Sequence, residues 1–144
     1  MSTSSTTDGT TKIDVRLKIC ALWIAMLFLF AYGDIFGMFQ SGRIDEIRAG
    51  TVGGMHISQV FLLAVSVYIA IASVMVFLTL ILPPRVNRWA NIVLASLYIV
   101  SIVGSVVGET WVYFRFLSIV ECALLVLVIW YSWRWRAETD ARVT

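Results

Sequence analysis

Acidic side chains inside apolar stretches are the feature of this sequence that could support chemistry. Asp34 lies in the first of four long apolar runs, and Glu121 lies near the middle of the fourth. An ionised side chain at the centre of a bilayer costs at least about 2.5 kcal/mol, so it usually faces a partner or a cavity. These two acids, together with Arg115 in the fourth run, are therefore the first candidates for a functional site.

Asp34 and Arg115 are expected at the same depth in a membrane. With a rise of about 1.5 Å per residue, Asp34 lies about 22 Å from the inner end of its helix, in the outer third of a core about 30 Å thick. Arg115 lies about 6 Å below the outer end of the fourth helix by the same rise. We therefore predict an ion pair between the two side chains. The alternative is that Arg115 extends to the outer surface and pairs with Glu109.

Glu121 falls about 15 Å into the fourth helix, near the midplane of the bilayer. Its side chain is too short to reach the surface, so the carboxyl group needs a proton or a hydrogen-bonded niche. Ser118 lies one turn outward and Arg115 another three residues out, which makes a polar track toward the outer surface. Glu121 is either a structural residue that joins helices or a proton or cation site.

Polar residues of the other helices complete a candidate pocket in the outer half of the bundle. Gly33/Gly37 and Gly104/Gly108 have a spacing that permits two helices to approach closely. The side chains expected to line the pocket come from the first, second and fourth runs. They are Tyr32, Asp34, Gln59, Arg115, Ser118 and Glu121.

Four apolar segments must position these side chains, at about residues 19–39, 58–82, 89–107 and 111–133. A spanning helix needs about 20 mostly apolar residues, and bilayers admit only helices or closed barrels. The runs are too long and too continuously apolar for barrel strands. The chain is also 60% hydrophobic and only 14% charged, unlike a soluble domain. The sequence predicts an all-α polytopic membrane protein, an antiparallel bundle of four transmembrane helices.

The distribution of basic residues predicts the orientation of this bundle. If the chain crosses the membrane four times, eight basic residues fall on one side: Lys12, Arg16, Lys18, Arg85, Arg88, Arg134, Arg136 and Arg142. Because cytoplasmic loops carry an excess of Lys and Arg, both termini are expected in the cytoplasm. Residues 1–15 are expected as a disordered tail, residues 16–135 as the transmembrane domain and residues 136–144 as a polar C-terminal tail.

The loops carry further signals. Pro83-Pro84 predicts a sharp stop after the second helix, and Asn87 resembles a start signal for the third. In the long first loop, isoleucines among charges predict a short surface helix, and glycines then predict a sharp turn or a close approach. This loop is either a connector or a lid over the outer mouth of the bundle. The candidate lid residues are Gly53, Gly54 and His56.

Several kinds of site have no signal in the sequence. His56 is the only histidine, and one histidine cannot make a common zinc site by itself. No phosphate-binding loop, dinucleotide fingerprint or Ser/His/Asp set is visible. The net charge of +2, without a basic stripe, gives no support for nucleic-acid binding. We therefore expect no metal, no cofactor and no catalytic residues, which argues against an enzyme without excluding one.

Four sequence blocks together carry a resemblance. They are residues 32–35 (Tyr-Gly-Asp-Ile), 50–54 with Gln59, 87–91 (Asn-Arg-Trp-Ala-Asn) and 129–133 (Ile-Trp-Tyr-Ser-Trp). Over about residues 15 to 135, the chain resembles an uncharacterised family of small bacterial four-helix membrane proteins, a domain of unknown function. In outline it is also similar to DoxX-like four-helix proteins. The resemblance implies a bacterial cytoplasmic (inner) membrane protein and supplies no activity.

Two functions compete. The first is binding or transport of a small solute or proton through the candidate pocket, as in small multidrug exporters, which are similar in outline. This chain departs from them because its first acid lies late in helix one and an intramembrane Arg115 is present. The second is a non-catalytic accessory or structural subunit that docks another membrane protein. Beside the lipid bilayer, the candidate partners are a second copy of the chain or another membrane protein.

Overall fold

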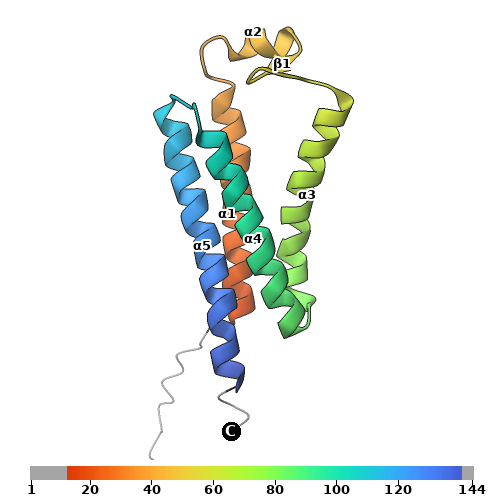
Figure 1. Cartoon of the computed structure of the whole chain (residues 1–144), viewed down its shortest axis with the longest axis vertical. Coiled ribbons are helices and arrows are strands. Elements are labelled where there is room, and N and C mark those ends of the chain that lie inside the picture. The colour runs from red at the N-terminus through yellow and green to blue at the C-terminus, as the bar shows by residue number, and fades with distance from the viewer. Residues whose placement is uncertain (1–12, 141–144) are drawn as a thin grey trace, which may run out of the picture.

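The structure, a computed structural model, describes residues 13–135 and the backbone of residues 136–140. Within this part of the chain, four long antiparallel helices form the body of the molecule (Figure 1). Each is long and apolar enough to cross a membrane. They are α1 (Val15–Gly37), α3 (Gln59–Ile81), α4 (Pro84–Val106) and α5 (Val112–Asp140). The prediction of an all-α protein with four transmembrane helices is confirmed, and the chain is a multi-pass membrane protein.

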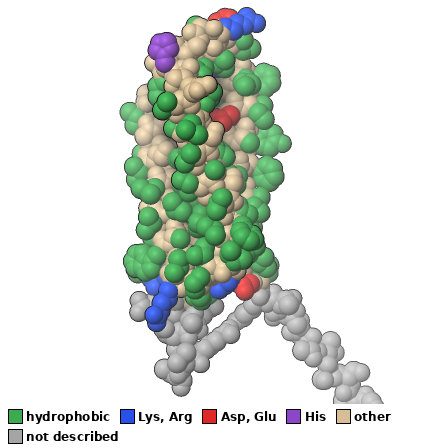
Figure 2. Space-filling model, turned by 90° about the vertical axis from the view of Figure 1, so that its right-hand side faces the viewer, with side chains coloured by type: hydrophobic (Ala, Val, Ile, Leu, Met, Phe, Trp, Pro, Cys, Tyr) green, Lys and Arg blue, Asp and Glu red, His purple; other side chains and the backbone are tan. Residues whose placement is uncertain are grey.

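The two ends of the bundle differ. We call one the terminal end, because α1 begins and α5 ends there, beside the α3–α4 junction (Figure 1). The other is the loop end, which carries α2 (Arg43–Arg48) and a hairpin of β1 (Thr51–Val52) and β2 (Met55–His56). Figure 2 shows apolar side chains along the length between the ends, with Lys and Arg gathered near the ends themselves. This pattern is the one expected of a protein surrounded by lipid.

Helix packing follows a regular spacing of buried residues. Helix α1 packs against α3 and α5, and α4 packs against α5. Buried positions recur at intervals of three and four, so that one stripe of each helix faces its neighbours. On α4 these positions are Asn87, Asn91, Ala95, Tyr98 and Ile102, and on α5 they are Ser118, Glu121, Leu125, Val128 and Ser132. Polar residues thus occupy several positions of the stripe.

Helices α1 and α4 begin earlier than the apolar runs suggested. Helix α1 begins at Val15 rather than residue 19, because Asp14 caps it by accepting a hydrogen bond from the Arg16 N–H at 2.8 Å. Helix α4 begins at Pro84 rather than residue 89, since proline fits the first turn, where no N–H is needed. Asn87 was therefore wrong as a start signal, because it is a buried residue inside α4.

Helix α5 also ends later than the apolar run suggested. Helix α5 continues to Asp140, into residues 136–144 that were expected as a polar tail. Most of the expected N-terminal tail, residues 1–12, lies outside the described residues. Its order is therefore still a prediction.

The first loop contains the predicted short helix, α2, and a hairpin that was not predicted. Gly53 and Gly54 form the hairpin turn with φ values of 55° and 78°. Two consecutive positive φ values match the right-handed twist of a hairpin and favour glycine at both positions. A Cβ at either glycine would meet nothing within 4 Å, so these residues serve a turn and no close approach. His56 is exposed at the end of the same hairpin.

Helix α3 is unevenly covered. Toward the loop end it diverges from α1 and α4 (Figure 1). Its buried side chains, Ala72, Met75 and Thr79, all lie in the half near the terminal end. Residues 62–67, in the other half, are all exposed. Among the described residues, no helix covers residues 62–67 of α3.

Candidate functional site

The two intramembrane acids approach each other across the contact of α1 with α5. A Cβ placed on Gly33 would lie 3.7 Å from Leu117 Cδ1, and one on Gly37 would lie 3.7 Å from the Tyr113 hydroxyl. A Cβ at either glycine would make ordinary van der Waals contact, so α1 faces α5 at these positions without an unusually close approach. This antiparallel register puts Asp34 about 7 Å nearer the loop end than Glu121. The two carboxyl groups are close enough to interact electrostatically. We call Asp34 and Glu121 the acid pair.

Glu121 is the deeper member of the acid pair. The residue is only 6% exposed, whereas Asp34 is exposed. Within the described residues, neither a hydrogen bond nor an ion pair reaches the Glu121 carboxyl group. The hydroxyl of Tyr68 and the thiol of Cys122 lie within electrostatic range of it. A buried carboxylate without a partner is costly, so Glu121 needs a proton or an external cation.

Three aromatic rings form a layer beside Glu121. Tyr68 of α3 and Tyr98 of α4 have ring centroids 4.5 Å apart. Phe30 of α1 stacks on Tyr68 at 6.0 Å and on Tyr98 at 6.2 Å. The Tyr98 hydroxyl donates a hydrogen bond to the backbone carbonyl of Tyr68, and the Tyr68 hydroxyl interacts with Ser101. Because aromatic faces attract cations, acids beside such a layer form a surface suited to positive charge.

The sequence did not identify this aromatic layer as part of the site. None of its three residues, Phe30, Tyr68 and Tyr98, was among the selected pocket residues. The available signal was the position of each tyrosine near the middle of an apolar run. Tyrosines favour helix ends in membranes, so a central tyrosine hydroxyl requires a partner inside the protein.

Nearer the terminal end, a hydrogen-bonded network of four fully buried residues joins α1, α3 and α4. The Trp23 Nε1–H donates to Asn91 Oδ1 at 2.7 Å, and the Thr79 hydroxyl donates to the same oxygen at 3.3 Å. Asn91 Nδ2 donates to Asn87 Oδ1 at 2.5 Å, and Asn87 Nδ2 donates to the Thr79 carbonyl at 2.5 Å. We call these residues the amide network. It satisfies polar groups that would otherwise be unpaired in an apolar interior.

The predicted ion pair between Asp34 and Arg115 does not form. The two residues do lie at one level, as the depth argument predicted, because Gly33 faces Leu117. Arg115 nevertheless donates to the backbone carbonyl of Glu109, and no ion pair among the described residues includes Asp34. The alternative, in which Arg115 extends toward the surface, is closer to the structure. A long arginine side chain reaches polar groups at the membrane edge at lower cost than it enters the interior.

The remaining candidate residues divide into two groups. Tyr32 and Gln59 are exposed, and the nearest ring contact of Tyr32 is with Phe36 at 6.0 Å. Ser118 is buried one turn from Glu121 on α5. The structure therefore brings Ser118 and the acid pair together and leaves Tyr32, Gln59 and Arg115 outside the site.

In the described part of the chain, no group of three His, Cys, Asp or Glu residues could hold a metal ion.

Comparison with known proteins places the chain in a family. Residues 12–142 match the model of a family described as a family of unknown function, DUF6326. No curated protein and no solved structure matches the chain. The match covers all four transmembrane helices and both members of the acid pair. The resemblance to an uncharacterised family is confirmed, and the chain belongs to the family of unknown function DUF6326.

Proposed function

We propose that this membrane protein binds a small cationic solute or a proton at the acid pair and moves it across the bilayer. One observation carries the proposal: Glu121 as a whole residue is 6% exposed, and no hydrogen bond or ion pair reaches its carboxyl group among the described residues. A structural glutamate that joins helices would be expected to bond a neighbouring helix. A carboxyl group left without a protein partner is suited to an exchangeable one.

The chemistry is an exchange of one positive charge for another. Glu121 holds a proton when the site is empty, and a cation displaces that proton so that the buried carboxylate is always neutralised. Asp34, nearer the loop end and exposed, is the first carboxylate that an entering cation meets. The faces of Tyr68 and Tyr98 add attraction for an organic cation. The Glu121 carboxylate is neutralised at each step of this exchange, which keeps the energetic cost of its burial low.

The arrangement of the helices supports entry from the loop end. Helix α3 diverges there, and residues 62–67 are exposed, whereas the amide network ties α3 to α1 and α4 near the terminal end. We further propose that the hairpin with Gly53, Gly54 and His56 acts as a lid at this entrance. In a bacterial cytoplasmic membrane with both termini inside, the loop end faces outward.

The experiment is proton-coupled uptake in liposomes that contain the full-length protein and a pH-sensitive dye. A panel of monovalent cations, from Na⁺ to tetraphenylphosphonium, is added outside. We expect Glu121→Gln to abolish cation-driven proton release and Asp34→Asn to reduce it. Arg115→Gln is the matched control, because Arg115 points away from the acid pair, and we expect its flux to be unchanged. Flux in Glu121→Gln equal to that of the unmodified chain would overturn the proposal.

A second candidate function is that of an accessory subunit, and one observation favours it. Residues 62–67, in the loop-end half of α3, are all exposed, which leaves a surface for another membrane protein. In this case substitutions in the acid pair lower the abundance of the complex without changing a flux. Co-purification of one partner at a fixed ratio would support this function over transport, provided that substitution of residues 62–67 by larger side chains abolishes it.

A further inference from the structure

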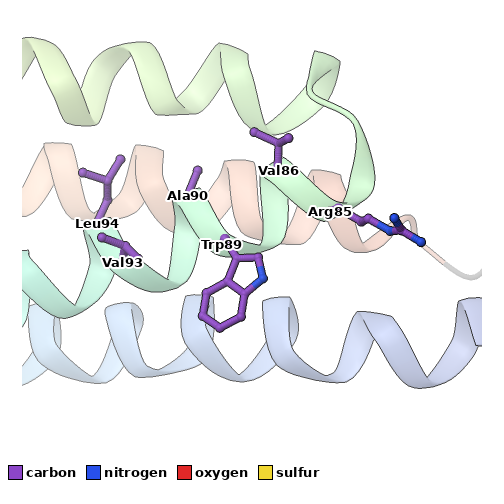
Figure 3. A pocket seen from close by; sticks show the side chains of 6 residues that line it. All are labelled: Arg85, Val86, Trp89, Ala90, Val93 and Leu94. Carbon is purple, nitrogen blue, oxygen red and sulfur yellow. The ribbon is translucent and has the colours of Figure 1, made fainter.

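A hollow on the surface of α4, separate from the acid pair, lies near the terminal end. Five of its six lining residues are apolar, and the sixth is an arginine. Val86, Ala90 and Leu94 project on the side of α4 toward α3, and Trp89 projects on the opposite side (Figure 3). The lining residues are Arg85, Val86, Trp89, Ala90, Val93 and Leu94. We call this surface the α4 hollow.

The shape of the α4 hollow follows from the sequence of one helix. Val86, Ala90 and Leu94 are spaced by four residues and form one ridge, while Arg85, Trp89 and Val93 form the next. Ala90 is small, so the first ridge dips at its centre. From Arg85 to Leu94 the helix rises roughly 13 Å, which is close to half of a hydrocarbon core about 30 Å thick. The hollow therefore has the length of one acyl chain in one leaflet.

Arg85 supplies a charge at the headgroup end of the hollow. Its guanidinium points along α4 away from Val93 and Leu94 (Figure 3). Arg85 is exposed, and among the described residues it has neither a hydrogen bond nor an ion pair. The sequence places no Asp or Glu between Glu46 and Glu109, so the surrounding helices α3 and α4 offer no counter-ion. The charge complement of Arg85 is therefore expected from outside these helices.

A second arginine lies beside the same end. Arg88 is three residues along α4, with its guanidinium 4.7 Å from the Trp133 ring centroid and 5.7 Å from that of Trp89. Its Nε is buried and has no hydrogen-bond partner. Guanidinium groups bind phosphate through paired hydrogen bonds, more specifically than lysine does. Arg88 thus adds a second positive charge near this end of α4, on the side toward Trp133 of α5, while Arg85 is the arginine that lines the hollow.

We propose that the α4 hollow binds one anionic phospholipid from the leaflet at the terminal end. The phosphate and its negatively charged headgroup bind Arg85, Arg88 adds positive charge nearby, and one acyl chain lies along Val86, Ala90 and Leu94. This site does not depend on the acid pair, because it lies on a different surface and uses no residue of the proposed transport path. Failure of the transport experiment therefore leaves the lipid site untouched, and the converse also holds.

The test is native mass spectrometry of the full-length protein in neutral detergent, titrated with phosphatidylglycerol or phosphatidylcholine. We expect one phosphatidylglycerol to be retained about ten-fold more tightly than phosphatidylcholine, and Arg85→Gln to remove that preference. Arg48→Gln is the matched control, because Arg48 is an exposed arginine near Asp45 at the opposite end. Ala90→Leu fills the dip, so it should weaken retention of both lipids.

Several results would overturn the lipid site. Equal retention of the two lipids by the unmodified chain, or equal losses in Arg85→Gln and Arg48→Gln, would remove the role of Arg85. Full competition by glycerol 3-phosphate would show that the headgroup alone binds and that the hollow takes no acyl chain. A dimer that Ala90→Leu disrupts, without any lipid preference, would assign the surface to a second copy of the chain. If Ala90→Leu does not fold, the comparison of Arg85→Gln with Arg48→Gln still tests the lipid site.

Discussion

Asn91 connects three transmembrane helices through a single side chain. Its Oδ1 accepts hydrogen bonds from Trp23 of α1 and Thr79 of α3, and its Nδ2 donates within α4. All of these residues are fully buried. Removing one partner from such a network leaves a buried donor without an acceptor, which costs more than the bond itself contributed. Asn91 is therefore expected to stabilise the fold, in contrast to the acid pair.

We expect Asn91→Ala to lower the free energy of unfolding by about 2 kcal/mol, because it leaves the Trp23 N–H unpaired and cancels two bonds between helices. Denaturant unfolding in one detergent, followed by tryptophan fluorescence, measures the change. Ser96→Ala is the matched control, because Ser96 is exposed on the same helix and bonds only the Ile92 carbonyl. We expect Ser96→Ala to lower the free energy of unfolding by less than about 0.5 kcal/mol. Equal losses in both variants would mean that the amide network has no special role.

A double-mutant cycle tests the separation of Asp34 from Arg115. Because Arg115 bonds Glu109 instead of Asp34, the effects of Asp34→Asn and Arg115→Gln on unfolding should add. We expect an interaction free energy below about 0.5 kcal/mol. A value above about 1 kcal/mol would indicate that the two charges pair in the membrane after all.

The sequence predicted the depth of these residues but not their direction. Depth follows from a fixed rise per residue, so Asp34 and Arg115 were correctly placed at one level. Direction depends on rotation around each helix and on competing acceptors, and the Glu109 carbonyl could not be anticipated as the partner of Arg115. For the same reason Tyr32 and Gln59 were assigned to the pocket, although both side chains are exposed. Rotation cannot be fixed before the helix contacts are known.

At the scale of the element, apolar length predicted all four spanning helices, whereas local signals placed their ends less well. Asn87 has the side chain of a helix cap, yet Pro84 already starts α4. The amide of Asn87 bonds the Thr79 carbonyl across the α3–α4 junction. The polar side chain of Asn87 therefore makes a tertiary hydrogen bond. The local sequence alone does not distinguish such a residue from a helix cap. The two-residue glycine turn of the hairpin was a readable signal, but the flanking strands are too short for a pattern.

The two Gly-x-x-x-Gly pairs differ in whether their first glycine faces a neighbouring helix, and this difference can be tested. Gly33 faces Leu117 of α5, but a Cβ on Gly104 would meet nothing within 4 Å. We expect Gly33→Leu to destabilise the protein by about 1–3 kcal/mol through overpacking. Gly104→Leu makes the same change in helix propensity and should not lower the free energy of unfolding. Thermal unfolding of the two variants in one detergent measures the contrast. A loss in Gly104→Leu alone would indicate that α4, and not α1, uses its glycine for contact.

Across the whole molecule, the helices are packed together near the terminal end, whereas α3 separates from its neighbours near the loop end. Near the terminal end, the amide network and the buried residues Ala72, Met75 and Thr79 hold α3 to its neighbours. Near the loop end, residues 62–67 of α3 contact no helix that would bury them. Segments with few buried contacts open at low free energy, so the two halves of α3 should differ in mobility. Glu121 lies beside the aromatic layer, and Asp34 lies nearer the more open loop end.

Two pairs of spin labels measure this asymmetry in lipid nanodiscs, after the unpaired Cys20 and Cys122 are replaced by serine. Labels at Leu63 and Val103 report on α3 and α4 near the loop end, and labels at Phe77 and Val93 report on the same helices nearer the terminal end. All four positions are exposed, so the labels should not disturb packing. We expect the loop-end pair to give a distance distribution about twice as broad as that of the terminal-end pair.

The effect of a cation on these distances connects the motion to the proposed transport. If entry to the acid pair depends on divergence of α3, a bound cation should narrow the loop-end distribution and leave the terminal-end distribution unchanged. Glu121→Gln should abolish that narrowing, because the cation then lacks its deep carboxylate. A loop-end distribution as narrow as the terminal-end one, with or without cations, would show that α3 is held rigidly. Access to Glu121 would then require a route other than the gap beside α3.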